Sequence, residues 1–106
     1  MLVVNRFRVP EGEAPAFRAQ VEQARAALAE RPGFVEATIG RNLDDPELWV
    51  LSTRWEHVGA YRRALSSYDV KLRAVPLLGR ALDEPSAYEQ VEPEGELNVW
   101  DTRSLG

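Results

Sequence analysis

The residues best suited to chemistry in this chain are two aromatic side chains with polar edges, Trp55 and Tyr61. Alternation of apolar and polar residues predicts a strand over 48–55, and helical spacing of apolar residues begins at about His57. Trp55 therefore lies where a strand passes into a helix, and Tyr61 is the first aromatic residue on the inward face of that helix. An indole N–H and a phenol O–H at such a junction could both donate hydrogen bonds to an anionic oxygen of an aromatic ligand. The simpler alternative is that both rings pack in the core.

Asn5 is the third polar group with a chemical role in this interpretation. It lies in a predicted strand over 2–9, on the same side as Phe7. An amide on an apolar strand face needs a hydrogen-bond partner from the protein or from a ligand. We therefore predict a cavity between sheet and helices, with the catalytic residues Asn5, Trp55 and Tyr61 and the substrate-binding residues Phe7, Leu65 and Arg73. Phe7 and Leu65 would form its apolar walls, and Arg73 would add positive charge if it points inward.

Several other kinds of chemistry are excluded by residues that the sequence lacks. There is no cysteine, and His57 is the only histidine, so neither thiolate chemistry nor a multi-histidine metal site is expected. His57 stands at a predicted helix start, where we expect it to face solvent. No serine–histidine–acid set, phosphate-binding loop or dinucleotide fingerprint is present. If this chain is an enzyme, it therefore lacks a built-in redox centre. Dioxygen chemistry would then need an electron-rich substrate, such as a hydroquinone, that supplies the electrons itself.

Length and net charge narrow the partners that we expect. At 106 residues the chain is long enough for one domain and too short for two. Its net charge of −4 argues against nucleic-acid binding, which usually requires a basic surface. The apolar start over residues 1–4 is too short for a signal peptide or a membrane span. We therefore expect no nucleic acid or membrane as a partner, and a cytoplasmic location.

The charges are unevenly distributed along the second half of the chain. Six basic and two acidic residues lie in 54–80, whereas six acidic residues and no basic one lie in 83–96. Two interpretations remain open. Either both stretches are solvated faces, or the acidic tail pairs with a basic helical face, on its own chain or on a partner subunit.

The other elements follow from periodicity and from the positions of Pro and Gly. Helices are predicted between Glu13 and Pro32, over 57–67 and over 68–75, and strands over 34–42 and 86–91. Pro76 is expected to end the last helix, and residues 77–82 fit either a loop or a helical turn. The turn at 44–46 implies that the strands on either side are antiparallel neighbours. This order predicts an α+β, ferredoxin-like split βαβ fold, with a four-stranded antiparallel sheet and helices on one face.

The face of this sheet away from the helices would be apolar at Leu2, Val4, Leu48 and Val50. A chain of this length has no further element that could cover such an area. A second copy of the same sheet is the economical cover, so we predict a homodimer built sheet to sheet.

Four short segments resemble the antibiotic biosynthesis monooxygenase family: residues 3–10, 31–34, 53–56 and 60–61. The resemblance covers 1–92 as one domain and leaves 93–106 as a C-terminal tail that could pack on the partner subunit. Subunits of that family are ferredoxin-like and pair into a dimeric α+β barrel, so the resemblance implies the same fold here. It also implies a cofactor-independent monooxygenase that acts with dioxygen on a small aromatic or quinol-type substrate.

Two branches of that family compare differently with this chain. The cofactor-free oxygenases resemble it at Trp55 and Tyr61. They carry an asparagine, thought to hold the substrate phenolate, where this chain has Leu51. The heme-degrading branch matches at Asn5 but needs an axial histidine on a later helix, and no histidine follows His57. The resemblance therefore favours oxygenase chemistry over heme degradation. The alternative is a non-catalytic ligand-binding or dimerisation module of the same fold.

Overall fold

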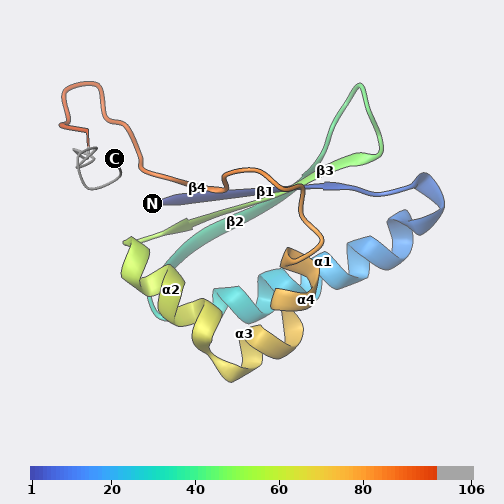
Figure 1. Ribbon diagram of the computed structural model, residues 1–106, viewed down its shortest axis with the longest axis horizontal. Coiled ribbons are helices and arrows are strands. Elements are labelled where there is room, and N and C mark those ends of the chain that lie inside the picture. The colour runs from blue at the N-terminus through green and yellow to red at the C-terminus, as the bar shows by residue number, and fades with distance from the viewer. Residues whose placement is uncertain (98–106) are drawn as a thin grey trace.

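A sheet and a layer of helices make up the computed structural model, which describes residues 1–97 (Figure 1). The antiparallel strands lie in the order β2-β3-β1-β4. Their bounds are β1 (Leu2–Arg8), β2 (Phe34–Arg41), β3 (Leu48–Trp55) and β4 (Ala87–Tyr88). The helices, which all lie on one face of the sheet, are η1 (Glu11–Glu13, a 3₁₀ turn), α1 (Ala14–Ala29), α2 (Val58–Ser66), α3 (Tyr68–Arg73) and α4 (Val75–Leu78). The predicted α+β, ferredoxin-like fold is confirmed.

The two central strands alternate as their sequences predict. On β3 the buried residues Trp49, Leu51, Thr53 and Trp55 face the helices, and the residues between them are partly exposed. On β1, Val3 and Phe7 are buried on the same side of the sheet. The period of two along a strand is therefore enough to assign each side chain of β1 and β3 to its face.

The first turn of α2 is held by two local features. Nδ1 of His57 accepts a hydrogen bond from the backbone N–H of Ala60 at 3.1 Å, so this residue caps the helix. Gly33, just before β2, has φ of +86°. A Cβ atom there would lie 2.4 Å from the Cβ of Ala60, so only glycine allows α2 to approach this closely. Together they set the start of the helix that carries Tyr61.

Two predicted elements differ from those observed. Pro76 does not end the helical region, because it lies in the first turn of α4, where its missing N–H leaves no helical hydrogen bond unmade. The predicted strand over 86–91 shortens to β4, which pairs only with Leu2 and Val3. Beyond β4 the chain leads away from the helices, near the N-terminus (Figure 1). Most of the predicted tail over 93–106 lies outside the described residues.

The outward face of the sheet combines apolar and charged residues. The four apolar residues predicted there, Leu2, Val4, Leu48 and Val50, are partly exposed. Beside them Arg6 donates hydrogen bonds of 2.6 and 2.7 Å to the two carboxylate oxygens of Glu84. These bonds hold the pKa of the Glu84 carboxyl below its ordinary value. One acid of the 83–96 stretch therefore pairs with β1 of its own chain rather than with a helix.

Candidate functional site

An aromatic cluster lies where β3 passes into α2. The ring of Trp55 has its centroid 5.5 Å from that of Tyr61, with 54° between the ring planes. On its other side Trp55 meets Phe34, the first residue of β2, at 5.4 Å and nearly perpendicular. We call Phe34, Trp55 and Tyr61 the Trp55 cluster. The predicted proximity of the indole and the phenol at this junction is confirmed.

Within this cluster the indole N–H is already used by the protein. Nε1 of Trp55 donates to Oγ1 of Thr53 at 2.9 Å, and both side chains are buried. Thr53 precedes Trp55 by two residues and therefore lies on the same face of the strand. Because the hydrogen bond fixes the indole, Trp55 presents a ring rather than a free donor to its surroundings. The expected direct N–H contact to a ligand is not available in this arrangement.

Tyr61, in contrast, has a hydroxyl without a partner. No hydrogen bond of this hydroxyl occurs within residues 1–97, although the residue is partly buried against the core. Burial raises its pKa above the ordinary value of a phenol, so the group is neutral and can donate at physiological pH. Leu65, one helical turn later, also packs against the core and lies on the same side of α2.

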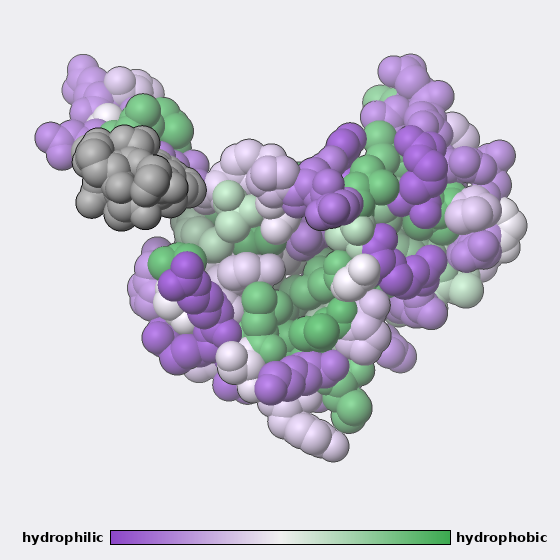
Figure 2. Space-filling view, viewed as in Figure 1, coloured by the Kyte–Doolittle hydropathy of each residue, from purple (hydrophilic) through white to green (hydrophobic). Residues whose placement is uncertain are grey.

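Asn5 supplies a second polar group without a partner. In the pairing of β1 with β3 it stands directly opposite Leu51, which is fully buried on the helix-facing side. Asn5 is nevertheless partly exposed, and its amide makes no hydrogen bond within the described part of the chain. Figure 2 shows an indentation between the sheet and helices α2 to α4, where hydrophobic residues gather. The helix layer therefore leaves the middle of β1 incompletely covered.

Comparisons with known proteins identify the family of this chain. The sequence model of the family described as antibiotic biosynthesis monooxygenase matches residues 1–72, which include Asn5, Trp55 and Tyr61. This chain belongs to that family. Within the family it is 33% identical over 94 residues to a deoxynogalonate monooxygenase from Streptomyces nogalater, covering 87% of this chain and 79% of that protein.

Solved structures support the same assignment. The structure of SnoaB, a cofactor-independent oxygenase from Streptomyces nogalater, is similar with a TM-score of 0.68 and 30% identity, over 88% of this chain and 96% of that one. An antibiotic biosynthesis monooxygenase-type protein from Deinococcus radiodurans has a TM-score of 0.70 at 17% identity, over 92% of this chain and 99% of that one. At that identity the second likeness concerns the fold alone.

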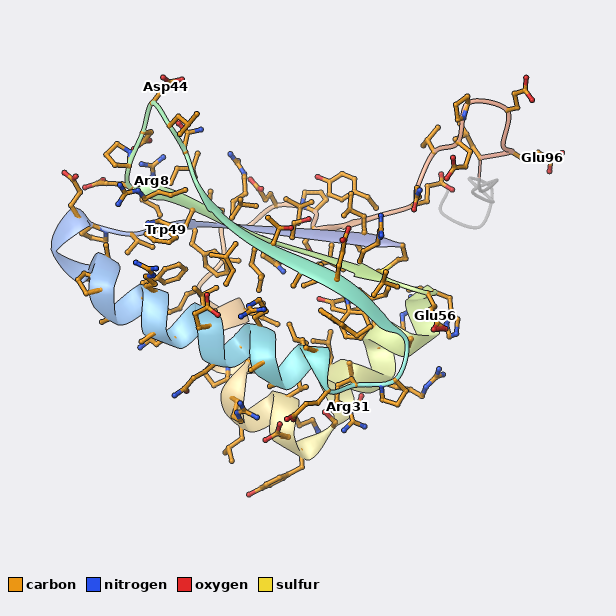
Figure 3. All side chains as sticks on the ribbon, turned by 180° about the vertical axis from the view of Figure 1, so that it is seen from behind. Arg8, Arg31, Asp44, Trp49, Glu56 and Glu96 are labelled. Carbon is orange, nitrogen blue, oxygen red and sulfur yellow. The ribbon has the colours of Figure 1, made fainter. Side chains whose placement is uncertain are left out.

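Two residues predicted for the site of this family member lie elsewhere. Phe7 pairs with Trp49, six residues before Trp55 on β3, which is about 20 Å along the strand. Its ring packs on Phe17 of α1 at 5.1 Å. The two ends of β3 appear in Figure 3, where Trp49 lies over the first half of α1 and Glu56 lies at the opposite end. Strand parity placed Phe7 on the correct face but could not show which end of the sheet it reaches.

Arg73 is the other exception. Its guanidinium donates to Asp69, one turn earlier on α3, at 2.9 Å and lies 3.7 Å from Glu30 at the end of α1. It lines a groove between α1 and the α3–α4 region rather than the space beside Tyr61. The condition set for Arg73, that its charge points inward, is therefore not met, and the charge is paired at the surface.

Phe34 and Thr53 are the neighbours of Trp55 that sequence reasoning did not assign to the site. A signal existed for Thr53, since it shares the strand face of Trp55. Phe34 could be assigned to the cluster only from the register of the β2–β3 hairpin, which pairs it with Trp55 across the strands. Within residues 1–97 no group of three or more His, Asp or Glu residues could hold a metal ion. In the same residues no helix is long and apolar enough to cross a membrane.

Proposed function

We propose that this chain is a cofactor-independent monooxygenase that acts on an electron-rich aromatic substrate of the quinol or anthrone type. One observation carries the proposal: within residues 1–97, neither the neutral Tyr61 hydroxyl on α2 nor the Asn5 amide on the helix-facing side of β1 makes a hydrogen bond. Family membership and the likeness to a deoxynogalonate monooxygenase and to a cofactor-independent oxygenase support it.

The proposed reaction needs little chemistry from the protein itself. An aryl-flanked CH₂ group, once enolised, can reduce dioxygen by itself. One oxygen atom becomes the new ring carbonyl, and the other leaves as water with the two hydrogens of the CH₂ group. The protein has to bind the ring, stabilise its enolate oxygen and exclude water. Tyr61 would donate its hydrogen bond to that oxygen, and Trp55 would form a fixed aromatic wall.

The cofactor-free oxygenases of this family carry an asparagine on β3, and Asn5 takes the role of that amide in this chain. That position is Leu51 here, and Asn5 lies directly across from it on β1. Side chains that face each other across antiparallel strands have Cβ atoms about 5 Å apart. An amide on the neighbouring strand would therefore enter the same region, displaced by about one strand spacing.

The separation between Asn5 and the end of the sheet that carries Trp55 and Tyr61 bears on the size of the substrate. Asn5 and Trp55 lie about four residues apart along the sheet, or roughly 14 Å between backbone positions. A molecule that contacts Asn5 and also reaches Tyr61 would be longer than a single ring. We therefore propose that substrates with two or three fused rings are preferred to simple hydroquinones.

The direct test is dioxygen consumption by purified protein of known metal content, with anthrone, a naphthohydroquinone and hydroquinone as substrates. We expect anthrone and the naphthohydroquinone to be oxidised, and one atom of ¹⁸O₂ to enter the new ring carbonyl of the product formed from anthrone. Asn5→Ala should lower the rate of this reaction. If no substrate in the panel is oxidised above the uncatalysed rate, the binding-module alternative replaces the enzyme. If hydroquinone is the best substrate, the size argument is wrong.

We also propose that the chain forms a homodimer through the outward face of the sheet. The partly exposed apolar residues Leu2, Val4 and Val50 support this, because they share the outward face of the neighbouring strands β1 and β3. An interface of that kind should bury on the order of 1,200 Å² or more. Sedimentation velocity at micromolar concentration should show a dimer, and Val50→Asp should shift it to monomer. A stable wild-type monomer would contradict the proposal.

A further inference from the structure

A second hollow lies at the opposite end of the sheet, on the open edge formed by β2. It has a volume of about 370 Å³ and is lined by Arg18, Glu22, Ile39, Gly40, Arg41 and Trp49. Its walls come from α1, β2 and β3, and none of these residues belongs to the Trp55 cluster. The volume lies within the usual range for small-molecule sites.

The hollow carries uncompensated positive charge. Arg18 and Arg41 make no ion pair within residues 1–97, and the Arg41 guanidinium lies 5.6 Å from the centroid of the Trp49 ring. Glu22 is the one acid in the lining, and its carboxylate accepts hydrogen bonds of 2.6 and 3.1 Å from Arg25. Glu22 therefore does not cancel the charge of the two lining arginines.

Trp49 adds a donor that the protein leaves unused. Only 9% of the residue is exposed, and its Nε1 is buried with no hydrogen-bond partner in the described part of the chain. An unpaired buried donor is unusual, because burial removes its hydrogen bonds to water and leaves the free-energy cost of that loss uncompensated. Trp55, on the same face of the same strand, has its N–H satisfied by Thr53. Within residues 1–97 the hollow is therefore lined by an indole whose N–H has no partner and by two arginines that make no ion pair, an arrangement that an anionic oxygen would complete.

We propose that this hollow binds a small aromatic carboxylate. The planar guanidinium of Arg41 matches a carboxylate in two-point geometry and would leave the indole face to meet it. One carboxylate oxygen would accept from Trp49 Nε1, Arg18 would pair with the second oxygen, and Ile39 would contact the ring of the ligand. The site is separate from the proposed active site and does not depend on oxygenase activity.

The test uses the indole N–H resonances in ¹⁵N-labelled protein, titrated with 2-naphthoate. We expect the Trp49 resonance, assigned through its proximity to the Phe17 ring, to shift in a saturable way while that of Trp55 stays in place. Arg18→Gln and Arg41→Gln should each raise Kd about tenfold, the effect of losing one charge-assisted hydrogen bond. Arg62→Gln, an exposed change on α2 with the same loss of charge, should leave Kd within about twofold.

Three results would overturn the proposal. The first is a Trp49 resonance that does not move at saturating 2-naphthoate. The second is an equal loss of affinity in Arg62→Gln and Arg41→Gln, which would indicate attraction by net charge alone. The third concerns the ligand class. If 2-naphthalenemethanol binds as well as 2-naphthoate, the carboxylate is not recognised, and if inorganic phosphate binds as well, the aromatic ring is not.

Discussion

Two tryptophans on one face of β3 have opposite surroundings, although they are the same residue type on the same strand. Trp55 lies between Phe34 and Tyr61, and its N–H is satisfied by Thr53. Trp49 lies against Phe17, with Arg41 over its ring, and its N–H has no hydrogen-bond partner among residues 1–97. We call Phe7, Phe17 and Trp49 the Phe17 cluster.

The neighbour two residues away on the strand explains this difference. Thr53 stands two residues before Trp55 and has a hydroxyl that can accept a hydrogen bond. Leu51 stands two residues after Trp49 and has no polar atom in its side chain. Whether the N–H of each indole on β3 has an acceptor therefore depends on the residue two positions away, which shares its face of the strand. Within residues 1–97 the fixed indole of Trp55 adjoins the Tyr61 hydroxyl, which makes no hydrogen bond, whereas the unpaired indole of Trp49 lies under Arg41, which makes no ion pair.

The largest expected effect is the loss of stability when the Phe17 cluster is opened. Phe17 contacts both Phe7 and Trp49 and is almost completely buried. Phe17→Ala should lower the free energy of unfolding by about 3–5 kcal/mol, as large-to-small changes in a core do. Urea denaturation measures this. Phe17→Leu should lose less than about 1.5 kcal/mol, and an alanine variant that loses less than that would show that the cluster is not part of the core.

The second effect separates chemistry from packing in the Trp55 cluster. Tyr61→Phe removes a hydroxyl that makes no hydrogen bond in the described part of the chain, and keeps the ring contact with Trp55. Turnover of an accepted substrate should fall about 100-fold, or roughly 2.7 kcal/mol, while stability changes by less than about 1 kcal/mol. Tyr68→Phe, at a residue that is 79% exposed on α3, is the control and should have full activity. Full activity in Tyr61→Phe would make this residue a packing residue.

A third change would convert the satisfied indole into an unsatisfied one. Thr53→Val keeps the shape of the side chain but leaves Nε1 of Trp55 without an acceptor. We expect a loss of about 1–3 kcal/mol in unfolding free energy, the penalty for a buried unpaired donor. Ser52→Ala, on the other face of β3, should change stability by no more than about 0.5 kcal/mol. Equal stability of Thr53→Val and wild type would remove the contrast between the two tryptophans.

The arginine over the Phe17 cluster should matter less. The Arg80 guanidinium lies 5.8 Å from the centroid of the Phe17 ring and also donates to Gln20 at the surface. Because the group is exposed to solvent, Arg80→Met should cost no more than about 1 kcal/mol in thermal or urea unfolding. A larger loss would mean that this arginine is part of the core of that end of the molecule.

The smallest effect is a dependence on alkaline pH. Burial raises the Tyr61 pKa in the folded state, so the unfolded chain loses this proton first as pH rises. The contribution to stability is fully present below the ordinary phenol pKa of about 10 and is lost as pH rises through the folded-state value. Absorbance titration near 295 nm should show a tyrosine that ionises after the others, and Tyr61→Phe should remove it. Titration of all tyrosines together would contradict the assigned burial.

Much of this protein follows from local rules that act within one element. Alternation along β1 and β3 was sufficient to place Asn5 and Phe7 on one face of the sheet and Thr53 and Trp55 on the same face. The meeting of Trp55 with Tyr61 was also predictable, since the strand passes into the helix within a few residues and little freedom remains between them. Family membership follows from the same segments, because they carry the matching residues.

The position of each residue along the sheet, and the partner of each polar group, depended on tertiary structure. Pairing register placed Phe7 opposite Trp49 and Asn5 opposite Leu51. Helix packing brought Glu30 near Arg73 and so kept that charge at the surface. The alternation of side chains repeats every two residues and is the same at both ends of a strand. It therefore shows which face of the sheet a residue lies on, but not which end of the sheet it is near. Hydrogen bonds and ion pairs act over about 3 Å, and only the assembled chain brings distant residues to that distance.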